Sequence, residues 1–321
     1  MGKYILRRLL ISIPVLLGVT LVAYFIMTLA PGDAVDMLIS PGLSEQDIAL
    51  KRKALGLDEP VMVQYVKWLG ELSRGNLGYS FTNRRPVTER IGERIGPTLS
   101  LTFASLFLSY LIAIPIGVLS AVRQYSALDY SATIFSFLGI SVPPFFFGLL
   151  LIYFFALKLD LFPTGGTYTF GSEHSIPDRL WHLVLPTVVL SLQNTGVVMR
   201  YTRSGMLEVI HQDYIRTARS KGLRERLIIF RHALRNALIP VITLAGVQFP
   251  FLLGGAIITE QIYNWPGMGR LVVEAINQRD YPTIMGLNLL AAVMVIFGNL
   301  FADVMYSVVD PRIRHAGDVD A

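Results

Sequence analysis

Six long stretches without a charged side chain dominate this sequence. They cover residues 9–32, 95–122, 130–157, 180–199, 236–259 and 281–302, with His182 inside the fourth. About 20 apolar residues in a helix cross a hydrocarbon core of roughly 30 Å. A spanning segment must also satisfy its own backbone N–H and C=O groups, which a helix does. We therefore predict an all-α, polytopic membrane protein with six transmembrane helices.

The composition excludes most other classes of protein. Hydrophobic residues make up 53% of the chain and charged residues 16%, and the mean hydropathy is +0.52. A soluble domain carries about 25% charged residues, and a globule of this size could not bury so much apolar surface. The same figures exclude disorder. Because the chain has no cysteine, disulfides, thiolate metal sites and a cysteine nucleophile are also excluded.

The first stretch has two interpretations, because Lys3, Arg7 and Arg8 precede it as they would in a signal peptide. Residues 28–30 would form a poor cleavage site, and the apolar stretch is longer than the core of an ordinary signal peptide. We expect this helix to remain in the protein.

Basic side chains near the ends of the spans predict the orientation, since short cytoplasmic connections carry an excess of Lys and Arg. The N-terminal cluster places the N-terminus in the cytoplasm, and six spans return the C-terminus there, where Arg312 and Arg314 follow the last span. Residues 200–236 hold nine basic and three acidic side chains, a net charge of +6 against +5 for the whole chain. The predicted topology is N-in and C-in.

The predicted spans divide the chain into four parts. These are an N-terminal transmembrane helix over residues 1–30, an extracytoplasmic helical segment over 31–97, a five-helix core over 98–310 that contains the cytoplasmic loop 200–236, and a cytoplasmic tail over 311–321.

The extracytoplasmic segment has the signals of two helices. Ser44 and Asp47 form a capping box, and Gly56 is suited to end the first helix. Pro60 suits the first turn of the second helix, whose apolar stripe we predict to contain Met62, Val66, Leu69 and Leu72. We favour a helix that only covers the bundle over a docking surface for an extracytoplasmic partner.

The third outer loop is dense in turn formers beside an interfacial aromatic side chain, namely Trp265, Pro266, Gly267 and Gly269. It is either a rigid extracytoplasmic cap over the mouth of the bundle or an ordinary tight turn. The residues favour neither interpretation.

The cytoplasmic loop between the fourth and fifth spans has the pattern of two short helices joined at a glycine. Asp213 is placed to cap the first helix, and Gly222 to end it in the left-handed conformation. The second helix carries apolar residues at helical spacing, namely Leu223, Leu227, Phe230 and Leu234. A loop that only attracts anionic lipid needs positive charge but no such order. The order therefore favours a docking element for a partner.

The same loop resembles part of a known family. Residues 214–223 and 231–240 closely resemble the EAA loop of ABC-importer permeases, in the variant of the dipeptide, oligopeptide and nickel (binding-protein-dependent) class. Further segments look like that family's N-terminal signature (residues 55–60, 64–65, 75–80 and 86–87) and its C-terminal one (260–269, 279–282 and 310–312). Each motif alone is weak, but together and in order they are specific. They indicate the first, or "B"-type, permease subunit.

The resemblance implies that residues 214–222 form a coupling helix, seated in a cleft of a cytoplasmic ATPase. The contact would involve Asp213, Tyr214, Ala218, Arg219, Lys221 and Gly222. The acidic first position of the general EAA pattern is Thr217 here, so no carboxylate contact is assigned to it. The family also implies a second permease subunit in a heterodimer, two ATP-binding subunits, an extracytoplasmic substrate-binding protein and a bacterial inner membrane. No nucleic-acid partner is expected.

Motifs for catalysis are missing from the sequence. Without a G-x-x-x-x-G-K-[ST] segment, ATP and Mg would have to bind partner subunits, and we expect no cofactor in this chain. Neither H-E-x-x-H nor G-x-S-x-G occurs, and no histidine has a partner at metal-ligand spacing. An intramembrane enzyme is therefore disfavoured, and we expect no catalytic residue and no metal site.

A self-sufficient ion-coupled carrier or channel is the alternative class. Such a carrier needs ionisable groups deep in the bundle. The clear candidate is Asp303, with Asn299 one turn away, although a polar contact between helices is the favoured interpretation. A polar translocation path, or equally a set of interhelical hydrogen bonds, is predicted from Ser141, Gln193, Asn194 and Gln248.

Two proline sites, Pro143 with Pro144 and then Pro250, are placed to break helices along such a path, or equally to form packing kinks. The cargo is less well determined than the class of transporter. Peptides, nickel chelates, opines, glutathione and some oligosaccharides are carried by systems that resemble this one. We predict short peptides or related small solutes.

Overall fold

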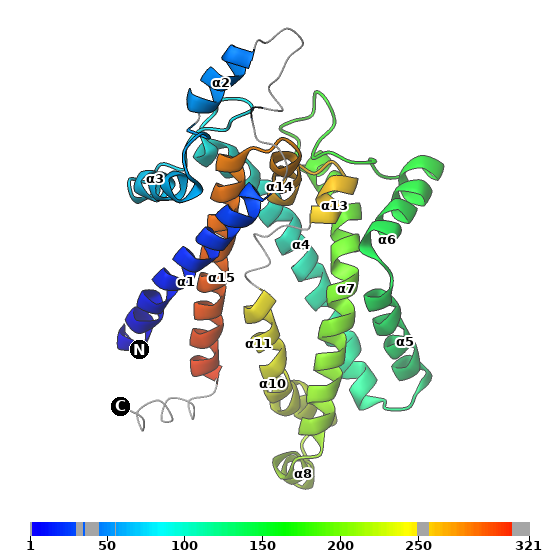
Figure 1. The fold of residues 1–321 in the computed structure, drawn as a ribbon. Coiled ribbons are helices and arrows are strands. Elements are labelled where there is room, and N and C mark those ends of the chain that lie inside the picture. Colours follow the sequence, from blue (N-terminus) through cyan, green and yellow to red (C-terminus); the bar gives the residue numbers. More distant parts are fainter. Residues whose placement is uncertain (1, 30–34, 36–44, 55, 249–256, 310–321) are drawn as a thin grey trace. The chain divides into compact units, whose positions relative to one another are not determined.

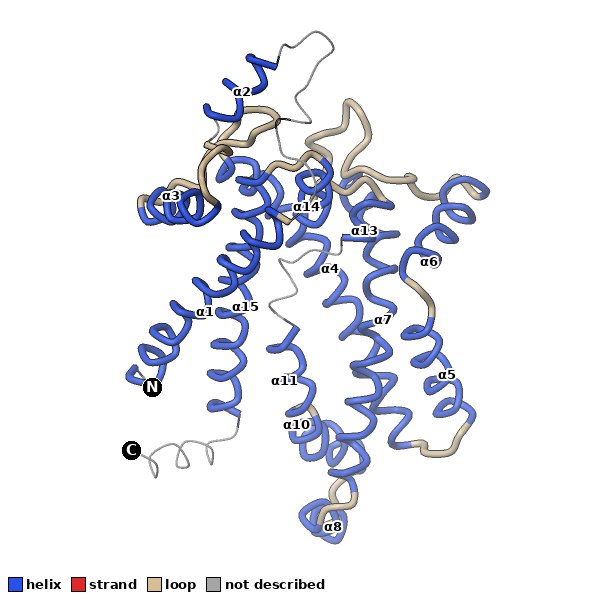
Figure 2. The backbone as a smooth tube through the Cα atoms, in the orientation of Figure 1, coloured by secondary structure: helices blue, strands red, loops and turns tan. Residues whose placement is uncertain are grey.

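The computed structural model describes residues 2–29, 35, 45–54, 56–248 and 257–309, and side chains within these except for residues 2–6, 246–248 and 301–309. Every regular element in these ranges is a helix, as the tube in Figure 2 shows. The prediction of an all-α protein is confirmed. Ser44, Pro250 and the side chains of Gln248 and Asp303 lie outside the described part.

Four helices are long and apolar enough to cross a membrane (Figure 1). They are α1 (Gly2–Thr28), α4 (Val87–Val122), α7 (Ile176–Ile210) and α15 (Tyr281–Val309), the last over Tyr281–Leu300. Two further pairs of helices, each bent at a short break, are long and apolar enough to cross a membrane when each pair is taken together. The described residues therefore hold four spans, or up to six if each pair is one span. The six predicted spans equal the upper count, and their orientation stays a prediction.

The third predicted span is not one continuous helix. It consists of α5 (Ala127–Ser141) and of α6 (Pro144–Leu151), which continues into the π-helical η2 (Ile152–Lys158), with a bend of 102° between them. Val142 and Pro143 each precede a proline, and both have extended backbones with ψ of 123° and 131°. Steric clash with the following proline ring disfavours the helical conformation there. The predicted helix break at Pro143 and Pro144 is confirmed.

A bend also marks the start of the fifth predicted span, residues 236–259, and the rod before the bend lies almost wholly in the predicted cytoplasmic loop 200–236. A rod made of α9 (Glu225–Leu227), η3 (Ile228–Ala233) and α10 (Leu234–Ala237) turns by 46° into α11 (Ile239–Gln248). Of the stripe predicted for this rod, Leu234 packs against the protein's interior, whereas Leu227 and Phe230 are exposed. The buried residues are Ile228, Ile229, Ala233 and Ala237. A π-helical turn contains more residues than an α-helical turn. The residues that share a face therefore differ from those predicted with the α-helical repeat of 3.6 residues.

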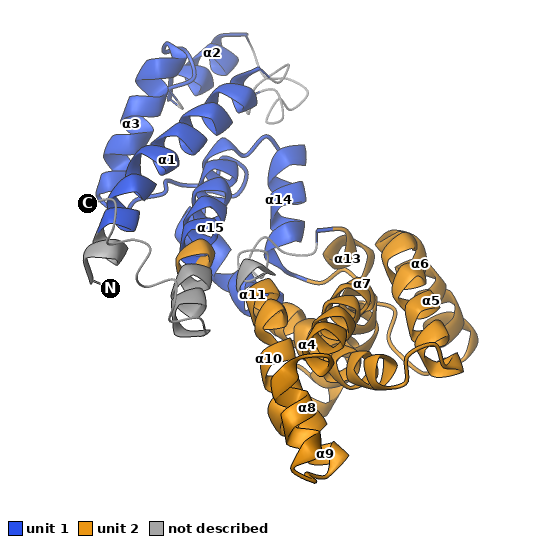
Figure 3. Cartoon of the chain, turned by 90° about the horizontal axis from the view of Figure 1, so that it is seen from below, with its two compact units in different colours: residues 1–98, 253–257, 266–297 blue, residues 99–252, 258–265, 298–321 orange. Residues whose placement is uncertain are grey.

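The chain forms two compact units that alternate along the sequence (Figure 3). Unit 1 comprises Met1–Thr98, Leu253–Ile257 and Pro266–Phe297. It holds α1, α2 (Glu45–Ala54), α3 (Val61–Ser73), the start of α4, α14 (Met268–Asn277) and most of α15. The four parts predicted from the sequence are bounded by the ends of the predicted membrane spans, whereas the two units are defined by contacts within the fold. The four-part division therefore stays a prediction.

The face of α3 that packs in unit 1 includes only part of the predicted stripe, since Leu69 packs in the apolar cluster around Tyr65 and Leu72 is partly buried. Tyr65 is 5% exposed, whereas Met62 and Val66 are exposed. The Tyr65 hydroxyl lies 3.0 Å from Thr20 Oγ1 of α1, and Tyr24 of α1 donates to Gln64 Oε1 at 3.1 Å. Polar pairs between α1 and α3 therefore select the buried face, which apolar spacing alone does not predict.

Unit 2 comprises Leu99–Leu252, Ile258–Trp265 and Gly298–Ala321. Helix α7 is its central element, since α5, α6, α10 and α11 all pack against it. This unit also holds most of α4, the elements η2, α9 and η3, the helix α8 (Asp213–Ser220) and most of α13 (Ile257–Ile262). Three apolar clusters form along α7, one around Leu185 and Val189, one around Val198 and Met199 and one around Met206.

Candidate functional site

A short exposed helix, α8, protrudes beyond the ends of α7 and α10 in unit 2 (Figure 1). Gln212 is its N-cap residue, with ψ of 150°, and Asp213 is its first helical residue. The prediction that Asp213 caps the helix is wrong in position, and the side chain of Gln212 makes no capping hydrogen bond. An acidic residue in the first turn still interacts favourably with the helix dipole.

The end of α8 follows the prediction. Gly222 has φ of +74°, the left-handed region that other residues adopt at a cost. The N–H of Gly222 bonds to the carbonyl of Arg219 at 2.9 Å, and the N–H of Leu223 to that of Ala218 at 3.4 Å. These bonds close the last turn and send the chain into α9. We call residues 212–224 the elbow.

The inner side of the elbow is anchored in an apolar cluster. Ile215 is fully buried and Ala218 is 8% exposed, and they share this cluster with Met206 of α7, with the buried residues of the α9–α10 rod and with Val118 and Ala121 of α4. Gly205 lets α7 and α10 approach closely, since a Cβ there would lie 2.6 Å from the carbonyl oxygen of Ala237. The elbow is therefore packed directly against α7 and the α9–α10 rod.

The outer side of the elbow is polar and accessible. The side chain of Asp213 is 97% exposed and that of Arg216 is 71% exposed. Tyr214 is partly exposed, and its hydroxyl accepts a hydrogen bond from Asn236 Nδ2 at 2.8 Å. Lys221 and Gly222 are exposed as well. Of the six predicted ATPase-contacting residues, only Ala218 faces inward.

An ion pair braces the corner of the elbow. Arg219 donates to Glu225 from Nη2 at 2.6 Å and from Nε at 3.2 Å. These hydrogen bonds raise the pKa of the Arg219 guanidinium. Thr217, where the general EAA pattern is acidic, donates its hydroxyl to the carbonyl of Asp213 at 3.0 Å. Arg219 is therefore engaged within the chain rather than freely presented.

A buried ion pair in unit 2 is not predicted from the sequence. Asp129 of α5 is 3% exposed and accepts hydrogen bonds from Arg203 Nε at 2.7 Å and from Nη2 at 2.8 Å. The Ser120 hydroxyl and the Tyr125 N–H also donate to this carboxylate. The pair joins α4, α5 and α7 three turns before α8. In the sequence, Arg203 is only one of the nine basic residues of segment 200–236.

A second buried ion pair lies in unit 1. Asp280 is fully buried, and Arg90 Nη1 donates to its Oδ2 at 2.5 Å. The hydroxyls of Ser80 and Thr283 and the N–H of Phe81 donate to the same carboxylate at 2.5, 2.8 and 2.9 Å. The structure thus brings together two segments that resembled the family's N- and C-terminal signatures.

The residues predicted for the translocation path are spread over three helices of unit 2. Ser141 ends α5 and is exposed, Gln193 and Asn194 lie on α7, and Gln248 ends α11. Asn194 Nδ2 donates to the carbonyl of Leu190 within its own helix at 3.4 Å. Their role as a path stays a prediction.

The predicted cap segment is tightly held. Trp265 is 3% exposed, and its N–H donates to the carbonyl of Glu260 at 2.8 Å. Pro266 is partly exposed, Gly267 is the N-cap residue of α14, and Gly269 is buried in the first turn of that helix. The N–H of Gly166 bonds to the carbonyl of Tyr263 at 2.8 Å, which ties the second outer loop to α13. An ordered segment fits either a cap or a tight turn.

Within the part of the chain that the structure describes, no group of three His, Asp or Glu residues is placed to hold a metal ion. The features of this molecule are instead those of a transport subunit: long apolar helices and an exposed, braced elbow at one end of the central helix.

Comparisons with known proteins agree with this class. Residues 113–315 match the family "Binding-protein-dependent transport system inner membrane component", and residues 1–102 match the corresponding N-terminal family. The chain therefore belongs to this family of membrane transport components.

Relatives align over nearly the whole chain. The sequence is 48% identical over 316 residues to the oligopeptide transport system permease protein AppB of Bacillus subtilis, covering 98% of this chain and 100% of AppB. It is 39% identical over 337 residues to the dipeptide transport system permease protein DppB of Escherichia coli K12, covering 98% and 99%. A chain of the inward-facing methionine ABC transporter MetNI has a similar fold, with a TM-score of 0.55 at 18% identity, covering 68% of this chain and 96% of that one.

Proposed function

We propose that this chain is the transmembrane permease subunit of an ATP-driven ABC importer, and that its cargo is short peptides or related small solutes. The observation that carries the proposal is the 48% identity to an oligopeptide permease over its full length. A dipeptide permease aligns over the same extent, which supports peptides as the class of cargo.

In this proposal the elbow receives the force of ATP binding. Its outer face, with Tyr214, Lys221 and Gly222, docks into a cleft of a cytoplasmic ATPase subunit. Closure of two such ATPases pushes the elbow, and the apolar anchor formed by Ile215 and Ala218 transmits the movement to α7 and α10. The nucleotide thereby biases an equilibrium between outward-facing and inward-facing states.

The remaining subunits follow from this mechanism. A second, different permease completes the translocation path, to which Ser141, Gln193, Asn194 and Gln248 contribute polar groups. An extracytoplasmic binding protein delivers the cargo near the segment Trp265–Gly269, and the assembly resides in a bacterial inner membrane. ATP and Mg bind the partner subunits, so this chain performs no covalent chemistry.

Gentle purification of the tagged chain from its native membrane tests the assembly. We expect a second permease and ATP-binding subunits to co-purify, with ATPase activity and ATP-dependent uptake of short peptides in liposomes. A lone chain that moves solute without ATP would refute the proposal and favour an ion-coupled carrier.

Gly222 tests the coupling role directly. Asp and Asn tolerate the left-handed region better than other side chains, and no heavy atom lies within 4 Å of a Cβ added at Gly222. Gly222→Asp should therefore fold but place a negative charge on the docking face, and it should abolish ATP-driven uptake. Gly222→Asn, of the same shape without the charge, should retain more uptake. Normal uptake by Gly222→Asp at equal membrane abundance would contradict the coupling assignment.

A further inference from the structure

The rod formed by α9, η3 and α10 has a second apolar face, which the described part of the protein leaves uncovered. Its inner face packs in the apolar cluster that also holds Ile215 and Ala218 of α8. Leu227 is 40% exposed and Phe230 is 54% exposed, and residues three apart share a face of a helix. We call these two side chains the ridge. Because α8 packs on the inner face, the ridge lies on a face of the rod that the elbow does not occupy.

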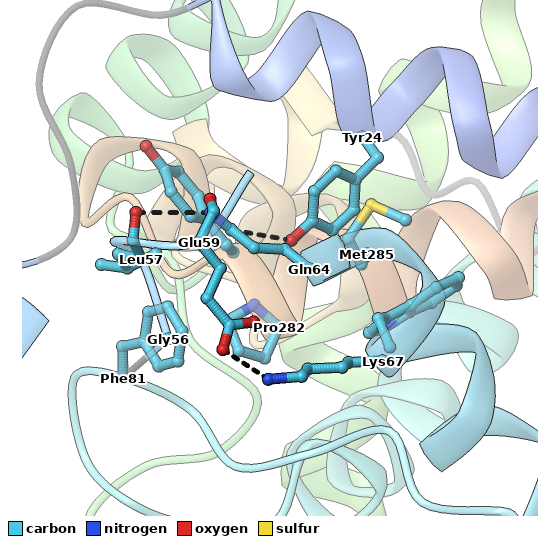
Figure 4. Close-up of a pocket in the computed structure, with 11 residues that line it drawn as sticks. Tyr24, Gly56, Leu57, Glu59, Gln64, Lys67, Phe81, Pro282 and Met285 are labelled. Carbon is cyan, nitrogen blue, oxygen red and sulfur yellow. Dashed lines mark hydrogen bonds and ion pairs between the residues drawn. The ribbon is translucent and has the colours of Figure 1, made fainter. Parts of the chain in front are cut away.

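The ridge is accompanied by four arginines, and none of them pairs with a carboxylate within the described residues. All four residues are exposed: Arg224, Arg226, Arg231 and Arg235. The acidic residue of the rod, Glu225, already pairs with Arg219 at 2.6 Å. By contrast, Glu59 and Lys67, the charged residues at a pocket of about 150 Å³ in unit 1, pair with each other at 2.5 Å (Figure 4). The rod therefore presents four uncompensated positive charges beside an apolar surface.

The rod lies where the chain enters a candidate membrane span. It turns by 46° into α11, and in the view from below α10 and α9 extend away from α11 (Figure 3). Helix α10 meets α7 at Gly205, six residues past Met199, where a predicted span ends. Six helical residues rise about 9 Å, which is comparable with the thickness of one headgroup layer. The rod therefore lies at the depth of the predicted cytoplasmic headgroups.

The chemistry of this surface matches an anionic lipid. The guanidinium group of arginine presents a planar set of N–H donors that fits phosphate oxygens. A helix with one apolar face and basic side chains beside it is typical of a segment that lies in the membrane interface. A cluster of four or more basic residues directly cytoplasmic of a span is typical of binding to anionic lipid. Water could solvate the four arginines, but it leaves the apolar surface of Leu227 and Phe230 exposed at a cost.

We infer that the rod is a binding surface for anionic phospholipid of the cytoplasmic leaflet. Phosphate groups accept hydrogen bonds from the four arginines and supply the missing counter-charges. The ridge inserts among the upper acyl carbons. This surface is separate from the outer face of the elbow, so it adds a lipid contact to the proposed transport function.

Native mass spectrometry of the chain with its co-purifying subunits tests the charge part of the inference. The nanodiscs contain equal amounts of phosphatidylglycerol and phosphatidylethanolamine with identical acyl chains, and we expect preferential retention of phosphatidylglycerol. Arg231→Gln together with Arg235→Gln should lower that retention about fivefold for each arginine, the usual effect of one basic side chain at an anionic leaflet. The matched control is Arg74→Gln, an exposed arginine of unit 1, which should change nothing.

A nitroxide label at the ridge tests its place in the bilayer. The natural chain has no cysteine, so Phe230→Cys carries the label at one position, and the unmodified assembly gives the background from partner cysteines. We expect the label to be accessible to oxygen, which partitions into lipid, and shielded from a water-soluble nickel chelate.

Equal retention of the two lipids by the unmodified chain, or unchanged retention in the double arginine variant, would overturn the inference. A label shielded from both reagents would mean that a partner protein covers the ridge. A label open to the nickel chelate would mean that the ridge faces water, and either result overturns the inference. These measurements involve neither ATP nor uptake, so their failure leaves the proposed transport function untouched.

Discussion

Replacing Asp129 by asparagine removes one half of the buried ion pair in unit 2 with almost no change of shape. The carboxylate accepts four hydrogen bonds, two of them from Arg203, whose side chain is 29% exposed. An amide accepts through one oxygen only, so its NH₂ group faces a donor and the guanidinium loses its counter-charge. Breaking such a buried pair costs about 3 kcal/mol, the lower end of the usual range, because Arg203 retains partial solvation.

The assay is a thermal unfolding scan of the purified subunit assembly. For a unit of this size, a loss of that magnitude lowers Tm by about 10 °C. The matched control is Asp213→Asn, where the side chain is 97% exposed and pairs with Arg216 at 3.6 Å. An exposed pair contributes at most about 1 kcal/mol, so the control should shift Tm by less than about 3 °C.

A second variant separates the ion pair from other effects of the substitution. In Asp129→Asn with Arg203→Gln, neither charge remains, so the double variant should be more stable than the sum of the two single losses predicts. Equal, small shifts for Asp129→Asn and Asp213→Asn would refute the reasoning. Strict additivity in the double variant would refute it too.

Three further predictions concern packing, a second buried charge and a helix cap. Gly205→Ala places a Cβ 2.6 Å from the backbone oxygen of Ala237 and should cost about 1–3 kcal/mol, measured by the same thermal scan, whereas Gly92→Ala in α4 meets no atom and should cost less. Asp280→Asn leaves the buried Arg90 unpaired and should lower Tm by at least as much as Asp129→Asn; an unchanged Tm would contradict the assigned burial. Ser126→Ala removes the side-chain acceptor for the N–H of Asp129 and should cost about 1 kcal/mol, whereas Ser126→Asp should restore it.

Much of the fold was predictable because its determinants are local. The length of an apolar run sets whether a helix can cross a membrane, and four of the six runs form such helices. The break at Pro143 and Pro144 follows from the ring geometry of proline. Gly222 ends α8 because the left-handed backbone conformation there has no steric cost for a residue without a Cβ. The family was recognisable from ordered motifs, and the full-length relatives confirm it.

Other features depended on tertiary contacts that no local pattern contains. Hydrogen bonds to α1 select the buried face of α3, and a π-helical turn resets the face of the α9–α10 rod. The partners in the two buried ion pairs are 74 and 190 residues apart in sequence.

The sequence alone therefore determined that the chain is helical, that Pro143, Pro144 and Gly222 interrupt helices, and that the chain belongs in a membrane. The tertiary structure decided which charges are neutralised inside the protein and which face solvent. Arg203 and Arg219 carry the same charge in the sequence. In the structure, Arg203 pairs with the buried Asp129, whereas Arg219 pairs with Glu225 at the corner of the elbow. The physical reason is that the ionic state and role of a side chain depend on the counter-charge and dielectric around it, and only packing brings these together.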